Sequence, residues 1–117
     1  MKNSQLKTQP KHLFSRDPND LDIDVRGLRT LYRSDYAARQ VLDALAARTS
    51  DSKSTTVNRI MDLLKGAGHI IQRKDVLHVF VELERLKCGV FKRGPKQTDS
   101  KFEWRVSLAV VGRLAAR

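Results

Sequence analysis

Basic side chains gather in a short stretch near the C-terminal end of this sequence: Lys92, Arg93, Lys96 and Lys101. Gly94 and Pro95 lie within this stretch and favour a turn between two strand-like runs, residues 90–93 and 102–106. Cations at this density can neutralise phosphates and release their counterions, whatever the base sequence. The pattern therefore predicts a basic β-hairpin that contacts a phosphate backbone. The alternative is an ordinary solvated hairpin, since charges and turn residues also protect edge strands.

The second run of this hairpin alternates as a half-buried strand requires. Phe102, Trp104 and Val106 fall on one face, and the two residues between them are charged. Trp104 could stack on a nucleic-acid base. Because its spacing matches that of the two other apolar residues, we expect it to belong to the core.

Composition limits the function further. The chain has 117 residues, which predicts one domain, and its formal net charge of +10 favours an anionic partner: nucleic acid, an acidic protein or an anionic membrane surface. The single cysteine, Cys88, excludes an internal disulfide framework; it could be a redox sensor, but a structural role is expected. Three widely spaced histidines predict neither a metal site nor a cofactor, and no catalytic constellation indicates an enzyme.

The N-terminal region is polar. Residues 1–20 contain Pro10 and Pro18 and few large apolar groups, which predicts a flexible basic arm. They contain no apolar core typical of a secretory signal, and no apolar run in the chain approaches membrane-spanning length. We expect a cytoplasmic, nucleoid-associated protein that does not bind a membrane.

The first helices are predicted from caps and periodicity. Residues 21–25 alternate like a short strand, whereas residues 28–32 would fit a helix, and the sequence leaves both open. Ser34 or Asp35 is a candidate N-cap for a helix over residues 36–48.

The middle of the chain begins with another open choice, since residues 55–57 could form a tiny strand or the start of a helix. Apolar residues then recur at i, i+3, i+4 and i+7, a helical face: Val57, Ile60, Met61 and Leu64. Gly66 and Gly68 predict the end of that helix, and residues 69–72 a turn.

A third helix and a last one follow. Asp75 is a plausible cap for a helix over residues 76–87, which Gly89 would end. Ser107 is expected to cap a last helix over residues 108–116.

This order of elements resembles the winged helix-turn-helix superfamily, over about residues 34–107. The run Leu83-Glu84-Arg85-Leu86-Lys87-Cys88-Gly89-Val90-Phe91 is similar to the junction between the third helix and first wing strand of many bacterial regulators. The resemblance implies an α+β, mainly helical fold with a three-helix core and a two- or three-stranded β-wing. The arm and the last helix would be extensions, and the domain would cover residues 21–117.

The resemblance also implies a function: a small transcriptional regulator that binds double-stranded DNA as a homodimer. The third helix, 76–87, would enter the major groove and residues 92–101 would be the wing. Residues 21–33 and 108–116 are the candidate dimer elements. The expected DNA-binding residues are Thr55, Thr56, Arg73, Lys74, His78, Arg85, Lys92, Arg93, Lys96, Gln97, Lys101 and Arg105.

The exposed face of the third helix departs from a DNA-reading pattern. Asp75 and Glu82 would repel phosphates, and Leu77 and Val81 lie beside them. The alternative is therefore a winged-helix protein-interaction module, or an accessory subunit of a nucleoprotein complex, with a protein partner on this helix. The Thr55–Thr56 pair likewise has two interpretations, donation to a phosphate or simple helix capping.

Overall fold

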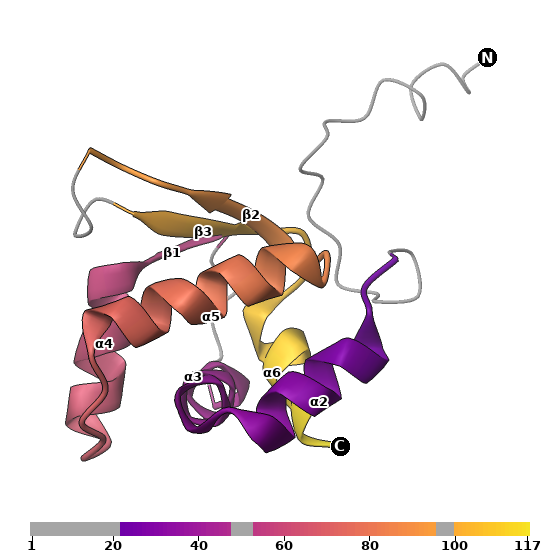
Figure 1. Cartoon of the computed structure of the whole chain (residues 1–117), viewed down its shortest axis with the longest axis horizontal. Coiled ribbons are helices and arrows are strands. Elements are labelled where there is room, and N and C mark those ends of the chain that lie inside the picture. Colours follow the sequence, from indigo (N-terminus) through magenta and orange to yellow (C-terminus); the bar gives the residue numbers. More distant parts are fainter. Residues whose placement is uncertain (1–21, 48–52, 96–99) are drawn as a thin grey trace.

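The computed structural model describes residues 22–47, 53–95 and 100–117. Within them, five helices and three strands confirm the predicted α+β, mainly helical architecture (Figure 1). In chain order the elements are α2 (Val25–Ser34), α3 (Tyr36–Ala46), β1 (Ser54–Thr56), α4 (Val57–Gly66), α5 (Arg73–Arg85), β2 (Gly89–Lys92), β3 (Lys101–Trp104) and α6 (Leu108–Ala116).

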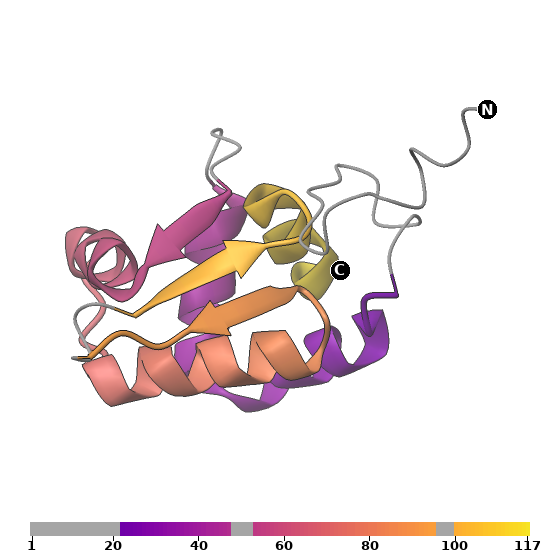
Figure 2. The same ribbon diagram turned by 90° about the horizontal axis from the view of Figure 1, so that it is seen from above.

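The three strands form an antiparallel sheet in the order β1-β3-β2. Phe102 in β3 is paired with Thr55 on one side and Phe91 on the other, so these side chains share one face. This inner face is buried, and the helices lie beneath or beside it (Figures 1 and 2). The opposite, outer face carries polar residues, including Lys92 and Glu103.

Side-chain caps fix where the early helices begin. Asp24 accepts a hydrogen bond from the backbone N–H of Gly27, so the segment after it is helical rather than extended. Asp35, one of the two predicted caps, does the same for α3 through Ala38. Thr56 ends β1 and also caps α4, so both interpretations of this segment were partly right.

The predicted bounds of the third helix were wrong at both ends. The helix α5 begins at Arg73, and Asp75 lies in its first turn instead of capping it. A carboxylate is favourable in either place, because both lie near the positive end of the helix dipole. At the other end, Lys87 takes a left-handed conformation with φ of 70°, and Cys88 N–H bonds the carbonyl of Leu83. The helix thus ends before Gly89, in a Schellman-type cap formed without glycine.

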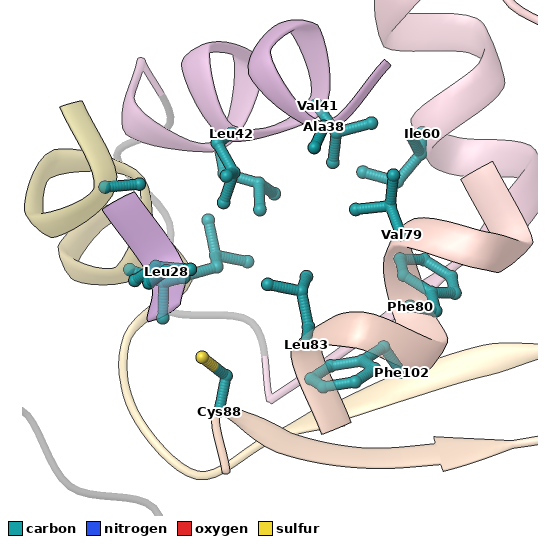
Figure 3. Packing of buried hydrophobic residues seen from close by; sticks show 14 of the residues in the cluster. Leu28, Ala38, Val41, Leu42, Ile60, Val79, Phe80, Leu83, Cys88 and Phe102 are labelled. Atoms are coloured by element: carbon teal, nitrogen blue, oxygen red, sulfur yellow. The ribbon is translucent and has the colours of Figure 1, made fainter. Parts of the chain in front are cut away.

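One hydrophobic cluster includes side chains from all the described helices (Figure 3). It extends beyond the predicted core of residues 34–107, since Leu28 in α2 and Leu114 in α6 belong to it. The helix α6 packs closely on α3: a Cβ on Gly112 would come within 2.5 Å of the Leu42 carbonyl oxygen. Trp104 and Val106 are buried, which confirms their predicted core positions.

None of the helices in the described segments is both long enough and apolar enough to cross a membrane.

Candidate nucleic-acid interface

Two of the predicted hairpin cations form a pair on the outer face of the sheet. Lys92 in β2 and Lys101 in β3 are cross-strand partners. Glu103 lies between their side chains, with its carboxylate oxygens 3.7 Å from Nζ of Lys92 and 3.9 Å from Nζ of Lys101. One carboxylate thus offsets part of the charge of two lysines. All three side chains are partly exposed, so these ion pairs are weak and easily exchanged for phosphate contacts.

Arg93 extends the hairpin surface in a different way. Its guanidinium carbon lies 4.7 Å from the ring centroid of Phe91, a contact with a ring rather than a carboxylate. The ring of Phe91 packs in turn edge-on against Phe80 of α5. The stacked guanidinium therefore rests on the core while its N–H groups remain available to an anion. The predicted hairpin residues Lys96 and Gln97 lie outside the described residues.

The start of α4 lies beside the hairpin. Thr56, its N-cap residue, pairs with Lys101 in the sheet, and the N–H of Val57 donates to the carbonyl of Ser100. Thr56 is exposed, and its Oγ1 already accepts from the N–H of Arg59. Its hydroxyl can still donate one hydrogen bond. The positive end of the α4 dipole adds to the cationic character of this region.

The start of α5 lies against the start of α4. Arg73 donates a hydrogen bond of 3.3 Å to the side-chain oxygen of Asn58 in α4. Lys74 and His78 follow and are both exposed. These contacts connect the first turns of the two helices, and the sheet pairing of Thr56 connects α4 to the hairpin. The hairpin, the start of α4 and the start of α5 therefore adjoin one another, although they come from three separate stretches of sequence.

Sequence reasoning missed two cations in the same region, Lys53 and Arg59. Lys53 precedes β1, and its carbonyl accepts the backbone N–H of Trp104. It lines a shallow hollow of about 330 Å³ on the sheet together with Lys92 and Glu103. Arg59 is exposed in the first turn of α4. The Thr56 cap was the signal that could have identified Arg59, since it places the third residue after it in the first turn.

Two predicted contact residues take structural roles instead. Thr55 is buried, and its Oγ1 accepts the indole N–H of Trp104 at 2.8 Å. Arg105 lies at the other end of β3 from the hairpin tip and donates to Asp22 at 3.1 Å and to the carbonyl of Lys87 at 3.2 Å. A backbone hydrogen bond is the main cause that holds the pKa of Asp22 below its usual value, and the hydrogen bond from Arg105 lowers this pKa further.

Charge on the rest of α5 is largely balanced within the helix. Arg85 donates to Glu82 through Nε at 3.0 Å and Nη2 at 2.7 Å, so a carboxylate offsets the charge of this guanidinium. The carboxylate of Glu84 accepts the backbone N–H of Phe91 at 3.3 Å. The usable cations of α5 are therefore at its beginning. Asp75 is only half-exposed in that first turn.

The apolar pair predicted to face a protein partner is less available than expected. Leu77 and Val81 are half-buried and pack against the hydrophobic core. The large hydrophobic side chains that are exposed in the described segments are instead Ile70 and Tyr36. Sequence reasoning placed Ile70 in a turn but did not identify it as exposed.

Other chemistries have little support in the described residues. Cys88 is buried, and burial raises the pKa of its thiol to about 12 from an ordinary value of 9.0, so it is not poised as a redox sensor. Among the residues described, no His, Cys, Asp and Glu side chains form a group of three that could hold a metal ion.

Comparison of the chain with protein-family models, curated proteins and solved structures finds no match.

Proposed function

We propose that this protein is a winged-helix domain that binds double-stranded DNA, and that it holds the duplex mainly through phosphates. The single observation that carries the proposal is the adjacency of three cationic parts: the hairpin with Lys92 and Lys101, the start of α4 at Thr56, and the start of α5 at Arg73. A net charge of +10 adds long-range attraction to a polyanion.

The topology supports the same proposal. The order α3-β1-α4-α5-β2-β3 along the chain is the one that the winged-helix resemblance implies, and the three strands form one sheet. In that fold α5 would be the recognition helix and the hairpin between β2 and β3 the wing. The first turns of α4 and α5 would then face the duplex together with the hairpin.

The distribution of free cations favours phosphate contact over base reading. Of the predicted base-contacting residues on α5, Arg85 is engaged with Glu82, while Lys74 and His78 remain exposed. Base-specific recognition usually needs several side chains with bidentate geometry. We therefore expect modest sequence preference, contributed by His78 and Lys74, on top of strong binding to any duplex.

Duplex binding at a series of salt concentrations tests this proposal. The variant Lys92→Ala/Arg93→Ala removes two hairpin cations, and each lost phosphate contact should lower the salt slope by about one unit. The matched control is Arg113→Ala/Arg117→Ala, which removes the same charge from exposed positions at the end of α6. That end lies away from the hairpin (Figure 1).

The expected result is a lower slope and weaker binding for the hairpin variant, with little change for the control. Equal losses in both variants would mean that net charge alone, and no defined surface, attracts the duplex. Full affinity and slope in the hairpin variant would refute the proposal and leave the protein-interaction alternative.

A further inference from the structure

An isoleucine stands almost fully in water at the turn between α4 and α5. Ile70 has 96% of its surface exposed. Isolated apolar residues on a surface are ordinary, but Ile70 has apolar neighbours. His69, the residue before it, packs edge-on against Tyr36, which is 60% exposed, with 6.4 Å between the two ring centroids.

A hollow opens beside Ile70. It has a volume of about 300 Å³, and its lining includes Met61, the buried Leu64 and the buried Ile71. Asp62 and Lys65, exposed on α4 and about one helical turn apart, also line it. We call this feature the turn hollow. A projecting apolar side chain and an apolar recess thus share one small surface.

The backbone holds Ile70 in a defined position. The chain leaves α4 through Gly68, whose φ of 84° is one that glycine adopts readily. The N–H of Gly68 bonds the carbonyl of Lys65 at 3.0 Å, and the N–H of His69 bonds that of Leu64 at 2.9 Å. Next along the chain, Ile71 is anchored in the core. Because the backbone of this turn is already fixed, its docking costs less conformational entropy than the docking of a flexible loop.

We infer that the occupant of the turn hollow is a second copy of this chain, related by a two-fold axis. In such a contact each copy offers the same patch, so Ile70 of one copy enters the hollow of the other and the exchange is reciprocal. A surface that carries both a projection and a matching recess suits this arrangement.

Charge complementarity favours a second copy at this surface. Two chains with a net charge of +10 repel one another over most of their surfaces. The lining of the turn hollow includes one carboxylate and one ammonium group, Asp62 and Lys65. An antiparallel two-fold contact would place Asp62 of each copy opposite Lys65 of the other. These two attractive ion pairs would oppose the overall repulsion between the two chains.

The position of the turn hollow leaves the proposed DNA surface free. It lies at the end of α4 that points away from the hairpin (Figure 1). It also differs from the dimer elements expected from the sequence, because the apolar side chains of α6, such as Val111 and Leu114, are buried within the chain itself. The inference does not depend on DNA binding.

Sedimentation equilibrium of the full chain tests the inference, over concentrations from about micromolar to about millimolar. We expect the average mass to rise from that of one chain towards that of two. Ile70→Glu should remain a monomer throughout, since it would place a charge in the apolar recess. The matched control Ala47→Glu adds the same charge at another exposed position and should dimerise like the parent.

A charge exchange tests the two-fold geometry. Asp62→Lys and Lys65→Glu should each weaken dimerisation, because each places like charges opposite one another. The double variant Asp62→Lys/Lys65→Glu should restore it.

Three results would overturn the inference. One is a parent protein that stays monomeric at every concentration, which would leave the turn hollow to a different partner. The second is a dimer that persists in Ile70→Glu, which would place the contact elsewhere. The third is a double charge variant no better than the singles, which would exclude the two-fold pairing. Because Ile70, Asp62 and Lys65 are all exposed, the variants at these positions should fold, and thermal melting would verify this.

Discussion

The indole Nε1 of Trp104 donates a hydrogen bond of 2.8 Å to Oγ1 of Thr55, which lies 49 positions earlier in the chain. Both residues are buried on the inner face of the sheet, where an indole N–H without a partner would be costly. The bond joins β1 to β3 and so helps to place the start of α4 beside the hairpin. It also explains why a threonine expected to contact phosphate is inside the protein.

The first prediction concerns this pair. Thr55→Val keeps the shape of the side chain but leaves the indole N–H unsatisfied, so unfolding should become easier by about 1–3 kcal/mol. Thr55→Ser retains a hydroxyl and should lose less. Denaturant unfolding followed by fluorescence measures both, since Trp104 is the only tryptophan. If the Thr55→Val protein were as stable as the parent but bound DNA more weakly, Thr55 would be a DNA contact and not a structural residue.

The second prediction concerns Glu103 and depends on the proposed function. Glu103→Gln removes the carboxylate that lies near Lys92 and Lys101, so both ammonium groups become more available to phosphates. Duplex binding should tighten, and its salt slope should steepen by up to about one unit. Asp43→Asn makes the same charge change on α3 and keeps an oxygen that can accept from Tyr32. If both variants gained equally, local release of the lysines would not be the cause.

The third prediction concerns pH and Cys88. Burial raises the pKa of its thiol to about 12, against an ordinary 9.0, so the folded state disfavours the thiolate. The contribution of the neutral thiol to the free energy of unfolding is complete below about pH 9. It is lost as the pH rises towards 12, by about 1 kcal/mol per pH unit. The difference in unfolding free energy between the parent and Cys88→Ala should therefore shift against the parent above pH 9. A pH-independent difference would contradict the buried, neutral thiol.

The fourth prediction concerns the end of α5. Lys87 has φ of 70°, a conformation that costs a residue with a Cβ about 1–2 kcal/mol. Lys87→Gly should therefore stabilise the protein by about 0.5–1 kcal/mol, even though it removes an exposed ion pair with Asp22. Lys65→Gly, the same change in a helical conformation, should destabilise by up to about 1 kcal/mol. Denaturant unfolding of both variants measures the contrast, and destabilisation by Lys87→Gly would refute it.

Local patterns predicted the elements well where periodicity and caps agreed. The stripe that begins at Val57 became α4, and the alternation around Trp104 became β3 with its apolar side inward. Boundaries were predicted less well, as at Asp75, because the same side chain is favourable at a cap and in a first turn. The left-handed turn at Lys87 had no signal in the sequence, since lysine has no preference for it.

The sequence by itself determined the excess of positive charge, the order of helices and strands after residue 57, and which faces are apolar, because these depend on composition and on neighbours a few residues apart. Only the tertiary structure decided which cations are free. Glu103 offsets Lys92 across the hairpin, and Asp22 holds Arg105. The pairing of Glu82 with Arg85, three residues apart on one helix, is by contrast local. Most of these pairs, like the burial of Thr55 and the exposure of Ile70, depend on contacts between segments distant in sequence, which no local pattern encodes.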